Sequence, residues 1–175
     1  MNNYHFDDVF LQYKSKGILI DSNLLLLYFI GKYSPDRITK FKRTSIFTID
    51  DFDIIESVFQ YFNKIVTTPN ILTEVSNLSG QLPEGIRKDC FKEFRKIITT
   101  LNEEYYASQD ISSEKQFLYF GLTDTGIIKA AKGKYLVFTE DMRLYNALLN
   151  LKIDVVNINH IRTYRWFGVD SDKDG

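Results

Sequence analysis

The chain has 175 residues and a formal net charge of −1, with 22 Lys and Arg against 23 Asp and Glu. This length fits one domain with its own core, and 44% hydrophobic and 26% charged residues exclude a disordered, collagen-like or coiled-coil chain. The near-zero charge argues against a protein that holds nucleic acid through an all-over positive surface, because phosphate affinity rests on Lys and Arg.

The cysteine count and the apolar runs point to a cytoplasmic protein. Cys90 is the only cysteine, which excludes an intrachain disulfide and a multi-cysteine zinc site and favours a reducing, cytoplasmic setting. The longest apolar run covers residues 24–30, whereas a membrane-spanning helix needs about 20 apolar residues. The sequence therefore predicts no membrane partner.

Short apolar, β-branched runs alternate with amphipathic stretches along the chain, which is typical of an α/β fold. We predict strands at 17–21, 65–68, 135–139 and 153–158, with helices between them. The helix that follows the first strand is apolar on all sides and is expected to end at Gly31. A long one-sided helix is expected over 86–105, and two later helices are expected to meet at Gly121.

Strands separated by helices imply parallel pairing with helices on both faces of the sheet. The expected fold is a three-layer α/β/α domain with a parallel sheet of four to five strands. We divide the chain into an N-terminal extension (1–16), the α/β domain (17–160) and a polar C-terminal tail (161–175). Residues 32–50 are expected to form a loop or insertion within the domain.

Acidic residues gather where the predicted strands end, and this edge is where open α/β sheets place their sites. Asp21 follows the first strand directly, and Asp141 lies two residues beyond the strand that ends at Thr139. Glu74 is expected in the first turn of the helix after 65–68, and Asp124 at the start of the helix that leads to 135–139. Carboxylates clustered in this way repel one another and commonly bind a hard cation, with Mg²⁺ or Mn²⁺ the natural candidates.

A purely structural interpretation stands beside this one. Asp21, Asp124 and Asp141 each lie at a predicted helix start, where Asp commonly caps backbone amides, and a lone Glu is commonly a surface residue. Phosphate-binding glycine loops and the G-x-S-x-G elbow are absent from the sequence. A hydrolase of small phosphoesters is disfavoured, because Asn23 stands where a D-x-D motif needs its second acid.

Four segments in chain order resemble the motifs of PIN-domain nucleases. They are ILIDSN at 18–23, TPNILTEV at 68–75, LTDTGII at 122–128 and YLVFTEDMRL at 135–144. The resemblance spans residues 17–158 and implies a flavodoxin-like or Rossmann-like sheet. It also implies a metal-dependent endoribonuclease, often the toxin of a bacterial toxin–antitoxin pair.

The resemblance also implies roles for individual residues. At the matching positions, the catalytic residues and metal ligands would be Asp21, Glu74, Asp124 and Asp141. Asn23 and Thr139 would orient these ligands or their waters, and Ser22 would support the first turn of the helix. RNA is then the expected substrate, and an antitoxin protein and a second copy of the chain are the protein partners to consider. A non-catalytic PIN-like module for protein interaction or RNA binding is the alternative.

Positive charge is concentrated between residues 32 and 43, where five Lys or Arg face one Asp and give a local charge of +4. We predict that Lys40, Lys42 and Arg43 contact RNA phosphates, with Phe41 and Phe47 offering surfaces on which bases stack. Arg143 is expected to hold a phosphate near the carboxylates. The alternative for 32–43 is a solvated loop.

Overall fold

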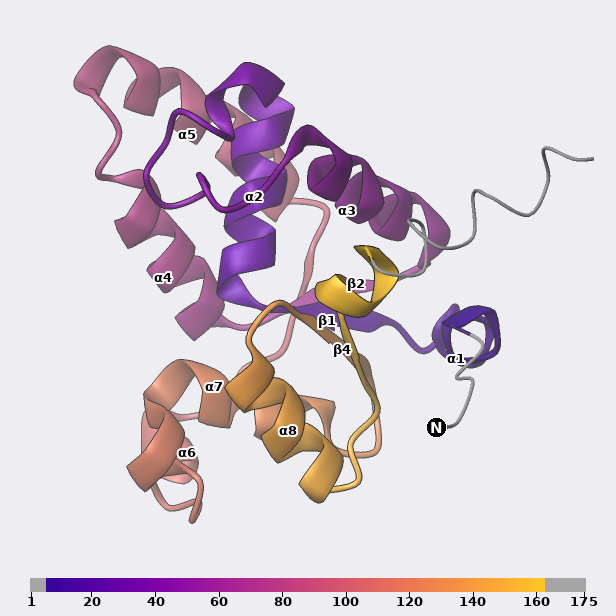
Figure 1. Cartoon of the computed structure of the whole chain (residues 1–175). Helices are drawn as coiled ribbons and strands as arrows, with labels where there is room; N and C mark the ends of the chain where they lie inside the picture. Colours follow the sequence, from indigo (N-terminus) through magenta and orange to yellow (C-terminus); the bar gives the residue numbers. More distant parts are fainter. Residues whose placement is uncertain (1–5, 163–175) are drawn as a thin grey trace, which may run out of the picture.

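The computed structural model describes residues 6–162 and has a three-layer α/β/α fold built on a parallel sheet (Figure 1). Its strands are β1 (Ile18–Ile20), β2 (Ile65–Thr67), β3 (Asn102–Glu103), β4 (Leu136–Thr139) and β5 (Val155–Asn157). They lie in the order β3-β2-β1-β4-β5, and all four pairings are parallel. The predicted α/β class and parallel sheet are therefore confirmed.

Helices cover both faces of this sheet. They are α1 (Phe6–Tyr13), α2 (Ser22–Tyr33), the 3-10 helix η1 (Pro35–Arg37), α3 (Ile49–Tyr61), α4 (Pro69–Ser79), α5 (Glu84–Ile98), α6 (Ser108–Ser112), α7 (Phe117–Ala131) and α8 (Met142–Asn150). In Figure 1, α2 to α5 lie above the sheet and α6 to α8 below it, while α1 lies beside the start of β1.

The centre of the core is β1, whose three residues are fully buried. Ile18 pairs with Ile65 of β2 on one side and with Leu136 of β4 on the other. A strand that is covered on both faces reads as a continuous apolar run, which is why β1 is recognisable in the sequence. The leucines at the start of α2 are likewise fully buried, as expected for a helix that is apolar on all sides.

Gly31 does not end α2, contrary to the prediction, because the helix continues to Tyr33. A Cβ atom on Gly31 would lie only 2.1 Å from Cδ2 of Phe52, a ring of α3. The glycine is therefore required for close packing of α2 against α3. The helix ends instead at Ser34, whose backbone N–H donates to the carbonyl of Ile30.

The predicted helix over 86–105 is wrong beyond Ile98, where α5 ends. The chain then forms β3, whose two residues are exposed and pair with Val66 and Thr67 of β2. A two-residue polar strand at a sheet edge carries no apolar alternation, so the sequence pattern gave no sign of it.

The N-terminal extension forms a helix that packs against the domain. In α1 the ring of Phe10 lies 5.3 Å from that of Phe62, and the Tyr13 hydroxyl donates to Oδ2 of Asp154 at 2.6 Å. Residues 1–5 of the extension lie outside the described residues.

The C-terminal side of the domain is tied to the inserted segment. Residues 158–162 are helical, and Arg162 makes two hydrogen bonds of 2.6 and 2.7 Å with the buried carboxylate of Asp51. The same carboxylate closes a capping box with Thr48 at the start of α3. Residues 163–175 of the predicted tail lie outside the described residues.

Candidate functional site

The candidate site lies at the carboxyl ends of β1 and β4. The chain proceeds from β1 outward to β2 and β3 on one side of the sheet, and to β4 and β5 on the other, so the strand order reverses between β1 and β4. Ligands of doubly wound sheets bind outside the strand ends at such a switch point. Asp21 directly follows β1, and Thr139 is the last residue of β4.

Asp21 is a buried carboxyl group that joins the two strands. Its Oδ1 accepts from the backbone N–H of Leu24 at 2.9 Å, which caps α2. Its Oδ2 accepts from the Thr139 hydroxyl and from the backbone N–H of Glu140 at 3.1 Å. Burial outweighs these hydrogen bonds and raises the pKa of Asp21 to about 7. Burial therefore disfavours the ionised form of this carboxyl group.

Thr139 connects Asp21 to Asp141. Its hydroxyl donates to Asp21 and accepts from the backbone N–H of Asp141 at 3.0 Å. Asp141 caps α8 with Oδ1, which accepts from the backbone N–H groups of Arg143 and Leu144. Its Oδ2 accepts no hydrogen bond within residues 6–162. The capping interpretation thus holds for Asp21 and Asp141, and it leaves one oxygen of Asp141 available to a ligand.

Asp124 shares its surroundings with two other acids. Burial and the charges of Asp141 and Glu74 raise its pKa to about 6, while Arg143 opposes this effect. Asp124 lies three residues beyond Gly121, whose non-helical backbone divides α7, so it stands in the first turn of the second part of this helix. In the described part of the chain its carboxylate accepts no hydrogen bond from a backbone N–H. Asp124 therefore forms no hydrogen-bonded cap, although its charge lies near the N-terminal end of this helical part.

Glu74 points to the same place from α4. Its Oε2 accepts a hydrogen bond of 2.8 Å from the hydroxyl of Ser22, the first residue of α2. It is the sixth residue of α4 and so lies in the second turn of the helix rather than the predicted first. Glu74, Asp124 and Asp141 form a group that we call the acidic cluster.

Glu140 is a site residue that the sequence analysis missed. Its Oε1 accepts from the Asn23 side-chain amide at 2.9 Å, and its charge contributes to the raised pKa of Asp21. The hydrogen bond of Asn23 thus goes to Glu140 and not to one of the four predicted acids. The available signal was the position of Glu140 between Thr139 and Asp141, directly after a strand.

The carboxylates of the described residues do not form a closed metal cage. Within residues 6–162, no three His, Cys, Asp or Glu side chains are grouped closely enough to hold an ion. Mg²⁺ rarely uses all-protein cages and is usually bound by one or two carboxylates together with waters and substrate phosphates. An ion at the acidic cluster would therefore be held by no more than two of its carboxylates.

Arg143 lies beside the acidic cluster. Its guanidinium donates to the backbone carbonyl of Tyr119 at 2.6 Å and lies 4.9 Å from the ring centroid of Phe120. The lowering effect of Arg143 on the pKa of Asp124 places its positive charge within electrostatic range of the cluster.

The basic residues of the inserted segment lie elsewhere. Arg43 contacts Gln81, just beyond the C-terminal end of α4, whereas the sheet edge adjoins the N-terminal end of that helix. Lys40, Lys42 and Arg43 are exposed, and Arg43 donates to the Gln81 side chain at 2.9 Å. The expected stacking surfaces are wrong, because Phe41 and Phe47 are only 8% and 2% exposed and belong to the core.

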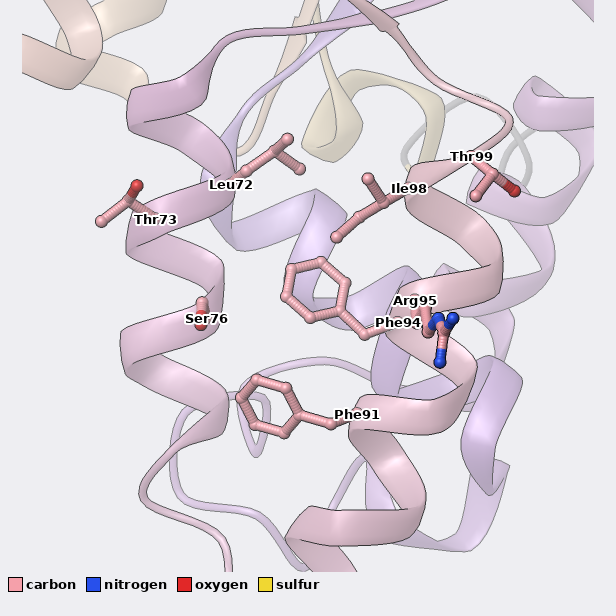
Figure 2. A pocket seen from close by; sticks show the side chains of 8 residues that line it. All are labelled: Leu72, Thr73, Ser76, Phe91, Phe94, Arg95, Ile98 and Thr99. Carbon is pink, nitrogen blue, oxygen red and sulfur yellow. The ribbon is translucent and has the colours of Figure 1, made fainter.

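Two hollows adjoin α4. One, of about 530 Å³, lies between α4 and α5, where Phe91 and Phe94 reach from α5 toward Leu72 (Figure 2). None of the four predicted acids lines it. The other, of about 360 Å³, lies between α4 and α7 and is lined by Glu74 among others. Only the second hollow adjoins the acidic cluster.

Comparison with protein-family models and with curated protein sequences gives no match for this chain. No helix among the described residues is long and apolar enough to cross a membrane. The fold and the site define the protein as a doubly wound, parallel α/β domain with acidic residues at its switch point.

Proposed function

We propose that the protein is a divalent-metal-dependent endoribonuclease of the PIN type that hydrolyses phosphodiester bonds of RNA. The observation that carries this proposal is the acidic cluster at the switch point of the sheet, where burial, together with the charges of Asp141 and Glu74, raises the pKa of Asp124 to about 6. Carboxylates that are held close together repel one another and destabilise the fold. Titratable groups with strongly shifted pKa values are concentrated at functional sites.

The residues contribute in different ways. Asp124 and the Oδ2 of Asp141 offer the carboxylate oxygens with the fewest protein partners and are the first candidates for direct ligands. Glu74 is held by Ser22 through Oε2, which leaves Oε1 to orient a water molecule. Asp21 is the fourth proposed ligand, through the carboxylate lone pairs that accept no hydrogen bond, and its hydrogen bond with the Thr139 hydroxyl orients Thr139. Mg²⁺ or Mn²⁺, when bound, supplies an activated water and stabilises charge on the leaving oxygen.

The test is cleavage of a single-stranded RNA by the isosteric variants Asp124→Asn and Asp141→Asn in Mg²⁺ or Mn²⁺. Loss of a carboxylate that binds the ion should lower the rate by about 100-fold or more. Asp53→Asn is the matched control, because Asp53 is exposed on α3. Full activity of a folded Asp124→Asn variant would refute the proposal.

Metal binding can be tested without an activity assay. Mn²⁺ should raise the melting temperature of the wild type, because a ligand at 100 times its Kd stabilises the folded state by about 2.7 kcal/mol. Asp124→Asn should lose most of this gain, and Asp53→Asn should keep it. An unchanged melting temperature in the wild type would instead favour a non-catalytic module.

The proposed partners rest on the resemblance, and the proposed location rests on the cysteine content. RNA is the proposed substrate, and the proposed protein partners are an antitoxin and a second copy of the chain. A cytoplasmic location is proposed because the chain has a single, buried cysteine.

A further inference from the structure

The hollow between α4 and α7 combines polar side chains with the apolar side chains of Leu78 and Leu122, and it opens next to the acidic cluster. Asn70, Thr73 and Asn77 of α4 line it together with Leu122 and Thr123 of α7. Glu74 lines the same hollow and belongs to the acidic cluster, so the two are continuous. A molecule in the hollow would therefore lie against the candidate site.

The α4 side of the hollow presents unpaired amides. Asn70 and Asn77 are seven residues apart, which is about two helical turns, so both lie on the face of α4 that carries Glu74. Within residues 6–162, neither side-chain amide has a hydrogen-bond partner, and the same is true of the hydroxyls of Thr73 and Thr123. Each amide offers both a donor and an acceptor to a ligand.

The charge of the hollow disfavours an anion as its occupant. Neither Lys nor Arg lines it, and Glu74 adds a negative charge at one end. A phosphate group would be repelled there, whereas a neutral group with donors and acceptors on its edge would be accepted. Leu122, which is 40% exposed, offers an apolar contact for the flat face of such a group.

A nucleobase has this combination of a neutral polar edge and a flat apolar face. Asn side chains form hydrogen bonds with base edges, and sequence-specific RNA recognition uses unpaired bases that are turned out of the stack. The volume of about 360 Å³ lies at the lower end of the range of about 300–1,000 Å³ for small-ligand sites. It suits one nucleoside and not a double helix.

We propose that this hollow binds one unpaired nucleobase of the RNA, next to the phosphodiester that is cleaved, with Asn70 and Asn77 hydrogen-bonding to its edge. That the bound base belongs to RNA rests on the proposed nuclease function. The consequence is that cleavage selects for the base at one position of single-stranded RNA.

The first experiment measures this selection. The wild type and the variants Asn70→Ala and Asn77→Ala cleave a randomised single-stranded RNA in Mg²⁺, and the base on each side of every cut is sequenced. The wild type should prefer one base by about tenfold or more, because a well-made amide pair discriminates to this extent. At least one alanine variant should reduce the preference to about threefold or less.

The matched control is Asn150→Ala, which changes an exposed Asn at the end of α8, away from the hollow. It should keep the wild-type preference. If both hollow variants cut RNA with an unchanged preference, the base site is wrong while the nuclease function stands.

The second experiment separates the two proposals by measuring binding instead of cleavage. The four nucleosides, which carry no phosphate, are titrated into the metal-free protein, and side-chain amide signals are followed by NMR. We expect one nucleoside to bind best and to lose about tenfold in affinity in Asn70→Ala or Asn77→Ala. This result without any RNA cleavage would reject the nuclease and keep the base site. Absence of nucleoside binding, as expected if the hollow docks a protein, would overturn the inference.

Discussion

Replacing Asp21 with Asn should stabilise the metal-free protein at alkaline pH and destabilise it at acidic pH. The folded state raises the pKa of Asp21 from its ordinary value of 3.8 to about 7, chiefly through burial. Folded protein therefore binds this proton more tightly than unfolded protein does. The contribution to stability is fully present below pH 3.8 and is lost as the pH rises through 7.

The magnitude follows from the size of the pKa rise. One pKa unit corresponds to about 1.4 kcal/mol, so ionising Asp21 in place removes about 4 kcal/mol of stability above pH 7. Asn cannot ionise and still offers an acceptor to the N–H of Leu24. Its amide nitrogen, however, would face the N–H of Glu140, which now donates to Oδ2, at a cost of about 1–2 kcal/mol. The net gain at pH 8 should be about 2–3 kcal/mol.

Urea unfolding of the wild type and of Asp21→Asn, in EDTA at pH 4 and at pH 8, measures the difference in their free energies of unfolding at each pH. The variant should be the more stable protein at pH 8 and the less stable one, by about 1–2 kcal/mol, at pH 4. Asp53→Asn should differ from the wild type by less than about 0.5 kcal/mol at either pH, because its carboxyl group is exposed. If Asp21→Asn lowered the free energy of unfolding equally at pH 4 and at pH 8, burial would not raise the pKa of Asp21.

Two further predictions concern packing and an ion pair. Gly31→Ala should lower the free energy of unfolding by about 1–3 kcal/mol, because its Cβ would overlap the Phe52 ring, while Gly85→Ala, with no atom within 4 Å, should not destabilise the protein. Arg162→Ala should cost about 2–4 kcal/mol at pH 7, because it leaves the Asp51 carboxylate buried without its cation. Burial alone would raise the pKa of Asp51, but hydrogen bonds from Arg162 and Thr48 hold it below its ordinary value of 3.8. Without Arg162 the buried carboxyl group should take up its proton at a higher pH, so this loss should shrink as the pH falls toward 3.8 and below it. Urea unfolding measures both variants. A Gly31→Ala variant as stable as the wild type would contradict the packing prediction. A loss of stability in Arg162→Ala that does not vary with pH would contradict the ion-pair prediction.

Much of the fold is predictable because its central strands are buried on both faces. The fully buried run 18–20 can be read directly from its apolar residues. Strand β3 is not predictable, since Asn102 and Glu103 are exposed and their strand conformation comes from pairing with β2. The packing role of Gly31 is also invisible in the sequence, where a glycine after an apolar run has the pattern of a helix end.

The candidate site was predictable in position and not in detail. Asp21 and Asp141 follow strands that the sequence reveals, so their place at one sheet edge follows from parallel pairing. The bond between Asn23 and Glu140 and the raised pKa of Asp124 depend on contacts between distant segments. The prediction that Phe41 and Phe47 offer stacking surfaces is wrong, because whether these rings face solvent or the core depends on how the chain folds back over α2.

The hydrogen bond between Thr139 and Asp21 has a consequence for protein synthesis, because it spans 118 residues. At about 5–20 residues per second, the ribosome makes β4 about 6–24 s after β1. In that interval β1 can pair with β2, while the edge that receives β4 stays open. A nascent chain that stops before β4 lacks both Thr139 and Asp141. Nascent chains of this length therefore carry no assembled site, and any activity appears only after β4 and Asp141 have been made.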